Sequence, residues 1–145
     1  MRLTTQTDYA LRMLMYLATQ DGSRTIDEIA SAYDISRNHL MKVAQRLAAN
    51  DFIISQRGRG GGLTLAREPA EINIGAVIRM MENTDQFVEC QMGSSNGCII
   101  TPVCGLQHMI RDAVDAFLNH LDQFTLEDAL ASRAEFKGIF VETAI

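Results

Sequence analysis

The chain has 145 residues, of which 47% are hydrophobic and 21% are charged, the balance of an ordinary globular protein. No apolar run approaches the roughly 18 residues of a membrane span, so we expect a soluble, cytoplasmic protein with no membrane partner. The net charge of −5 is unevenly divided: residues 1–67 carry nine Lys and Arg against six Asp and Glu, whereas residues 68–145 carry four against twelve. Only the front half is therefore expected to face a polyanion.

Sequence patterns in the front part of the chain predict three helices. The first spans residues 4–20, where apolar side chains recur at helical spacing after a threonine cap. Thr25 and Glu28 form the capping-box pattern that opens a short second helix, and Ser36 is expected to cap a third helix over residues 37–49. Two short helices joined by a tight turn are typical of a helix-turn-helix. The predicted inward residues of the third helix are Leu40, Val43, Ala44 and Leu47.

The polar face of the third helix carries side chains suited to reading DNA. Arg, Asn and Gln can form paired hydrogen bonds with purine edges, and Lys binds phosphates. The alternative is a plain solvated helix face. The predicted DNA contacts on this face are Ser36, Arg37, Asn38, His39 and Lys42, and the same face includes Gln45 and Arg46.

A glycine-rich hairpin follows the third helix. Residues 52–55 and 63–65 have the pattern of strands, and the loop between them carries two arginines among four glycines. Such a loop can lie close to a sugar-phosphate backbone and insert an arginine into a minor groove. It is not a P-loop, because it precedes a strand and lacks the Lys-Ser/Thr pair. Helix, turn, helix and hairpin in this order predict a DNA-binding winged helix. The predicted wing contacts are Arg57, Arg59, Gly60 and Gly61.

All three cysteines of the chain lie within fifteen positions, at Cys90, Cys98 and Cys104. Asn73 is expected to cap a fourth helix over residues 74–82 that leads into this segment. Thr101 is predicted to cap another helix with Pro102 at its first position, which would place Cys104 in a first turn where the dipole favours a thiolate. Three thiolates predict a soft-metal or iron–sulfur site that is one ligand short of the usual four.

Other uses of the cysteines are open on the sequence alone. They can be small buried hydrophobic side chains, since free Cys is among the most buried residue types. Structural zinc is a further alternative, but it prefers tighter spacings than gaps of seven and five residues. A disulfide scaffold is disfavoured because the cysteine count is odd and the chain is long enough to bury a core.

The longest predicted helix follows the last cysteine. Its apolar residues recur in steps of three and one, and polar and charged residues fill the opposite face. The small head has limited surface to cover this stripe, so we expect a twofold dimer joined here. Packing onto the fourth helix of the same chain is the alternative. The predicted dimerisation residues are Leu106, Met109, Ile110, Ala113, Val114, Phe117, Leu118 and Leu121.

These elements define a mainly α fold with a small β-wing, composed of a winged helix-turn-helix head and a long dimerisation helix. We expect the DNA-binding head to cover residues 1–68, and a linker helix with the cysteine loop to cover residues 69–104. The dimerisation helix and a C-terminal helical tail would cover residues 105–145, with another short helix starting at Thr125.

Several stretches of the chain resemble the Rrf-two family of bacterial winged-helix regulators. They are Met1–Arg12, Ser36–Leu40, Arg57–Gly62 and the three cysteines before a long helix, and the resemblance covers nearly the whole chain. Residues 98–104 together with Ser-Arg-Asn-His on the third helix are most similar to a nitric-oxide-sensing branch of that family. The resemblance implies a 4Fe–4S cluster on the three cysteines, with 2Fe–2S as the alternative. It also implies a homodimer that binds a double-stranded DNA operator.

The resemblance implies a fourth ligand as well, an aspartate near the N-terminus that the opposite subunit donates. The matching residue is Asp8, whose alternative role is an exposed acid in a first helical turn. Another branch uses a histidine three positions after the last cysteine, but here that position is Gln107 and His108 lies one residue beyond. One residue turns a helical side chain by about 100°. The gap between Cys90 and Cys98 is also longer than in many relatives, which leaves the cluster type open.

Together these features predict a transcriptional regulator, with a repressor favoured, that senses nitric oxide, iron or redox state. One alternative is a cluster-free thiol or zinc sensor that still binds DNA. Another is an iron–sulfur electron-transfer or carrier protein. An enzyme is not expected, because His39, His108 and His120 lie on predicted helices without a paired nucleophile and no catalytic motif is present.

Overall fold

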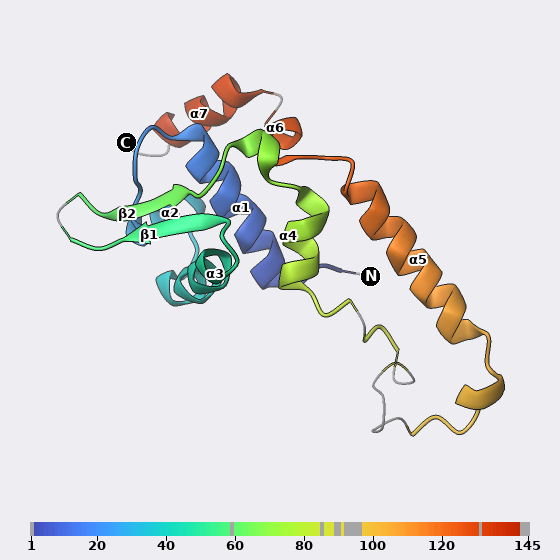
Figure 1. Cartoon of the computed structure of the whole chain (residues 1–145). Helices are drawn as coiled ribbons and strands as arrows, with labels where there is room; N and C mark the ends of the chain where they lie inside the picture. The colour runs from blue at the N-terminus through green and yellow to red at the C-terminus, as the bar shows by residue number, and fades with distance from the viewer. Residues whose placement is uncertain are drawn as a thin grey trace.

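The computed structural model of the chain describes residues 2–58, 60–84, 86–88, 91, 97–130 and 132–142. Figure 1 shows a head built around α1, with the wing projecting on one side and α5 extending as an arm on the other. None of the helices in the described ranges combines the length and apolar character that spanning a membrane takes. The elements in chain order are α1 (Thr5–Thr19), α2 (Ile26–Tyr33), α3 (Arg37–Ala49), β1 (Ile53–Gln56), β2 (Gly62–Leu65), η1 (Pro69–Glu71), α4 (Ile74–Met81), η4 (Thr101–Val103), α5 (Leu106–Leu121), α6 (Leu126–Ala129) and α7 (Arg133–Glu142).

The helices of the head follow their caps and apolar stripes. The hydroxyl of Thr4 accepts a hydrogen bond from the third residue of α1, and Thr25 and Glu28 form the predicted capping box of α2. α2 ends at Asp34 in the left-handed conformation, with φ of 52°. The four predicted inward residues of α3 are all buried, but Ser36 forms no side-chain cap bond. The predicted fold class, mainly α with a two-stranded wing, is confirmed.

The wing is an antiparallel hairpin that is fixed to the turn between α1 and α2. Its register runs from Ile53 opposite Leu65 to Gln56 opposite Gly62. Arg24 from the turn adds an isolated bridge on the other side of β2, because its backbone exchanges hydrogen bonds of 2.9 and 2.7 Å with Leu63. Gly62 permits this close approach, since a Cβ there would lie 2.9 Å from the Arg24 carbonyl oxygen. The orientation of the wing is therefore set by the head.

α5 is attached to the head along α4. Ile78 on α4 packs against Val114 and Leu118 in a small second hydrophobic cluster. At the end of α5, the carboxylate of Asp122 accepts two hydrogen bonds from Arg79, at 2.5 and 2.7 Å. The two contacts join α4 and α5 over the C-terminal half of α5, so the N-terminal half projects from the head (Figure 1).

The C-terminal part of the chain folds back onto the head. Thr125 opens α6 with a capping box, as predicted, and the next residue is buried. In α7, Phe140 packs edge-on against Tyr16 and Tyr33, with ring centroids 4.9 and 5.3 Å apart. Burial raises the pKa of Tyr33 to about 12, because the phenolate would lose its hydration. The sequence predicted a helical tail but not its docking on α1 and α2.

The predicted helix start at the last cysteine is wrong. Residues 101–103 form η4, Cys104 follows with an extended backbone, and α5 begins only at Leu106. Thr101 does not act as the N-cap, because its hydroxyl donates to the carbonyl oxygen of Cys98 at 2.8 Å. Cys104 therefore lies outside the first helical turn, and the dipole argument for its thiolate does not apply there.

Candidate nucleic-acid interface and cysteine segment

The exposed face of α3 brings the predicted base-reading residues together. Arg37 at its start forms an exposed ion pair of 2.8 Å with Asp27 of α2. Such pairs contribute at most about 1 kcal/mol, so a DNA phosphate can replace this partner. The other predicted contacts, all exposed, are Ser36, Asn38, His39 and Lys42. Their use in DNA binding remains a prediction.

Arg46 lies on the same helix but is used inside the protein. Its Nη2 donates to the carbonyl oxygen of Met80 in α4 at 2.5 Å, and its Nη1 donates to Oε1 of Gln6 in α1 at 3.3 Å. The side chain is half-buried by these contacts. The expectation that Arg46 points away from the apolar stripe with the DNA-facing residues is therefore wrong, because its guanidinium joins three helices of the head.

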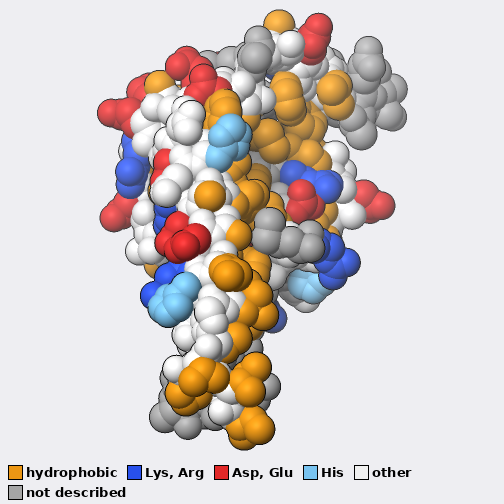
Figure 2. Space-filling view, turned by 90° about the vertical axis from the view of Figure 1, so that its right-hand side faces the viewer, with side chains coloured by type: hydrophobic (Ala, Val, Ile, Leu, Met, Phe, Trp, Pro, Cys, Tyr) orange, Lys and Arg blue, Asp and Glu red, His pale blue; other side chains and the backbone are white. Residues whose placement is uncertain are grey.

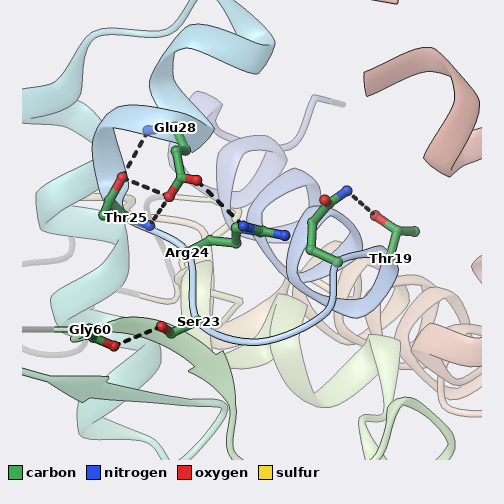
Figure 3. Close-up of polar contacts among 7 residues, drawn as sticks. Thr19, Ser23, Arg24, Thr25, Glu28 and Gly60 are labelled. Carbon is green, nitrogen blue, oxygen red and sulfur yellow. Dashed lines mark hydrogen bonds and ion pairs between the residues drawn. The ribbon is translucent and has the colours of Figure 1, made fainter. Parts of the chain in front are cut away.

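The wing loop places one predicted arginine at the surface. Arg57 is exposed at the end of β1, and Arg59 lies outside the described residues. Gly60 has φ of +79°, and its carbonyl oxygen accepts a hydrogen bond of 3.1 Å from Ser23, which Figure 3 shows beside the capping box of α2. A Cβ at Gly61 would collide with the carbonyl oxygen at the end of β1. The two glycines thus shape the loop, and contact with DNA remains a prediction for them.

Residues 97–104, the described end of the cysteine segment, lie at the tip of the α5 arm (Figure 1). Cys98 and Cys104 flank η4 and are both half-buried, whereas Cys90 falls outside the described residues. Among the residues that are described, no group of three His, Cys, Asp or Glu side chains is gathered tightly enough to hold a metal ion. The chemistry of the donors still fits the predicted cluster, since iron–sulfur clusters are held by cysteine thiolates.

Asp8 belongs to the head and not to the cysteine segment. It lies in the first turn of α1 and pairs with Arg12 at 2.8 Å, with about half of its side chain (48%) exposed. Figure 1 shows α1 inside the head, whereas residues 97–104 lie at the far end of the arm. A site shared by Asp8 and the cysteines remains a prediction. His108, the histidine next to the position used by another branch, is exposed on α5.

The structure divides the predicted dimerisation stripe of α5. Val114 and Leu118 are buried within the chain, so for these two the alternative of packing on α4 holds. Leu106 and Met109 are 55% and 68% exposed, and Figure 2 shows an apolar band that continues to the tip of the arm. Its use as a subunit interface remains a prediction. The partly buried members of the stripe are Ile110, Phe117 and Leu121, and Ala113 is exposed.

A helix-turn-helix with exposed polar and basic residues on its second helix, followed by a glycine-rich wing, defines a winged-helix DNA-binding regulator. Comparison with protein families agrees, because residues 3–132 match the Rrf2 family, described as iron-dependent transcriptional regulators. The chain belongs to the Rrf2 family. The matched proteins are transcriptional regulators and not enzymes, which confirms that prediction.

Individual relatives and solved structures support the assignment. The HTH-type transcriptional regulator NsrR of Bacillus licheniformis is 44% identical over 141 residues, which cover 96% of this chain and 99% of the relative. The NsrR of Bacillus subtilis is 44% identical over 137 residues, covering 93% and 94%. The structure of CymR, the global cysteine regulator of B. subtilis, has a TM-score of 0.69 at 25% identity and covers 91% of this chain and 98% of its own. T. potens IscR shares the fold, with a TM-score of 0.72 at 24% identity over 91% of this chain and 88% of its own.

Three polar residues that organise the site were not predicted from the sequence. Each forms hydrogen bonds with residues far away in the sequence: Ser23 over 37 positions, Gln6 over 40, and Glu82 over 75 and 78. Local periodicity reports only on neighbours within one or two helical turns. The sequence therefore contains no local signal that would have identified these contacts.

Proposed function

We propose that the protein is a homodimeric repressor that binds a double-stranded DNA operator through α3 and the wing and is controlled by an iron–sulfur cluster. The observation that carries the proposal is 44% identity along nearly the whole chain with regulators named NsrR, together with the three-cysteine segment. The sequence resemblance implies nitric oxide as the signal and 4Fe–4S as the cluster. When bound, the cluster would supply iron atoms that nitric oxide attacks.

The ligands we propose are Cys90, Cys98 and Cys104 of one subunit with Asp8 of the partner subunit. Thiolates are soft ligands that suit iron–sulfur clusters, whereas a carboxylate is a hard ligand and is the one most readily lost. Asp8 belongs to the head, whereas Cys98 and Cys104 flank η4. A bond between them would fix the orientation of the head, and its loss would release the head. Relaxed heads would then miss the spacing of two successive major grooves that a dimer requires.

The exposed part of the α5 stripe supports the proposed dimer. A twofold partner would cover Leu106 and Met109, which the chain itself leaves open to solvent. In this arrangement residues 1–68 read DNA and residues 69–104 hold the cluster, while residues 105–145 provide the helix that joins the subunits and the helical tail. A regulator of this kind works in the cytoplasm, where its DNA is.

An anaerobic absorption spectrum with iron and sulfide analysis, repeated after nitric oxide is added, tests the proposal. We expect a brown protein with about four irons per chain that bleaches on addition. Asp8→Ala should weaken the link between the cluster and DNA affinity, while Asp112→Ala on the exposed face of α5 serves as the acidic control. A colourless protein that binds DNA and contains zinc or only thiols would contradict cluster sensing. A reversible redox couple without sequence-specific DNA affinity would contradict the regulator.

A further inference from the structure

The last turn of α4 is tied to two other helices of the head. From α3, the guanidinium of Arg46 donates to the Met80 carbonyl oxygen at 2.5 Å and to Gln6 of α1 at 3.3 Å. A guanidinium is a rigid planar fork, so it holds its two acceptors in fixed directions. One side chain therefore sets the position of α3, which carries the predicted DNA contacts, relative to the end of α4.

A second tie joins the residue after α4 to the first turn of α1. Oε1 of Glu82 accepts hydrogen bonds from the Thr4 backbone N–H at 2.6 Å and from the Thr7 hydroxyl at 2.5 Å. Burial acts to raise the pKa of Glu82, but hydrogen bonds from Thr7 and Thr4 outweigh it, so this pKa lies below its ordinary value. The carboxylate is ionised at neutral pH. Because Thr7 is fully buried, this charged acceptor satisfies a hydroxyl that water does not reach.

Both ties precede the cysteine segment, which begins eight residues after Glu82 at Cys90. α4 ends at Met81, and residues 83–105 connect Glu82 to the start of α5. A pull from that segment on residues 80–82 would be passed to the groups of α3 and α1 that are hydrogen-bonded there. A shift at residues 80–82 would therefore act on α3 through Arg46 and on the first turn of α1 through Glu82.

We propose that residues 80–82 form a joint that transmits the state of the cysteine segment to α3, with Arg46 and Glu82 as its positioning residues. The inference rests on the proposed function, because it takes the cysteine segment as the sensor. Neither residue touches DNA in this arrangement. Each acts through the main chain or hydroxyl group that it holds.

The experiment measures the affinity for DNA of the full-length protein with its cluster and after the cluster has been removed. The probe is the duplex that the cluster-loaded wild-type protein selects from a random-sequence library. The test variants are Arg46→Met and Glu82→Gln. Arg67→Met is the matched arginine control, because its guanidinium also donates to a main-chain carbonyl oxygen, at 2.9 Å, but not in α4. Glu28→Gln is the matched carboxylate control, because Glu28 accepts from a threonine N–H and hydroxyl at 2.6 and 2.9 Å within the capping box of α2.

The ratio of the two affinities measures the coupling, which in allosteric proteins is typically about 5- to 150-fold. We expect Arg46→Met and Glu82→Gln to reduce this ratio by about 2- to 30-fold while both controls keep it. If the wild-type protein binds DNA more tightly with the cluster than without it, and both test variants keep that ratio, the joint is refuted and the proposed function stands. A wild-type ratio of one would refute the proposed function itself. Where either variant fails to fold, Thr7→Val removes the hydroxyl bond to Glu82 with little change of shape, and an unchanged ratio in that variant also refutes the joint.

Discussion

The arginines of the head differ in their surroundings, and the surroundings show which of them could contact DNA and which form bonds inside the protein. Arg57 is exposed beside the wing loop, whereas Arg46 and Arg67 donate to main-chain carbonyl oxygens within the head. The sequence correctly predicted a basic front half, but helical spacing placed Arg46 with the DNA-facing residues. The bond that holds Arg46 inside the head could not be predicted, because its acceptor, the Met80 carbonyl oxygen, lies 34 positions away in the chain. Exposure, which only the fold reveals, decides which positive charges a phosphate can reach.

Replacement of Arg57 by alanine should weaken DNA binding and reduce its dependence on salt. Each phosphate contact releases a condensed counterion, so the slope of log K against log salt should fall in magnitude by about 0.9. Titrations at several salt concentrations measure this slope. Arg111→Ala on α5 removes the same charge outside the predicted interface and should leave the slope unchanged. An unaltered slope in the Arg57 variant would remove the wing arginine from the DNA contacts.

At the scale of elements, α4 and α5 meet where a glycine leaves room for a carboxylate. A Cβ at Gly75 would collide with the Asp122 side chain and lie 3.0 Å from the Asp122 N–H. The same carboxylate is the one that accepts both hydrogen bonds from Arg79. The attachment of α5 to the head therefore depends on the absence of a side chain at this position.

Alanine at Gly75 should lower the melting temperature, although alanine is the better helix former. In a helix without steric conflict, replacing glycine by alanine stabilises by about 0.8–1 kcal/mol. Gly138 in α7 provides that case, because a Cβ there would meet nothing within 4 Å. Calorimetry should therefore show a lower melting temperature for Gly75→Ala and a higher one for Gly138→Ala. A stabilised Gly75→Ala protein would mean that the end of α5 does not pack this closely on α4.

At the scale of the whole molecule, the order of the elements was predictable because caps and apolar spacing are local signals. Thr25 and Glu28, the stripe of α1 and the glycine loop each predicted their element correctly. Two features were predicted wrongly, one because of a local hydrogen bond and the other because of packing between distant parts of the chain. The Thr101 hydroxyl bonds the carbonyl of Cys98 instead of capping a helix, and the α5 stripe is shared between the chain's own core and an open face.

Placing a lysine at Met109 should convert the proposed dimer into monomers. Met109 is 68% exposed in the single chain, and complete burial of a methionine contributes about 1.5–3 kcal/mol. The dissociation constant of the dimer should therefore rise at least about tenfold. Light scattering after gel filtration over a range of concentrations measures this. Asp112→Lys introduces the same side chain on the polar face of α5 and should leave the mass unchanged. A dimer that survives in the Met109 variant would place the subunit contact elsewhere.

The long free half of α5 also has a mechanical consequence. The free half, residues 106–113, is eight residues long, which at 1.5 Å per residue is about 12 Å. A rotation of about 20° at the Val114 contact would swing the tip by about 4 Å, given that length. The rise of DNA per base is about 3.4 Å, so the swing spans roughly one base-pair step. The free half of α5 thus acts as a lever that turns a rotation at its base into a displacement of the size of a base-pair step.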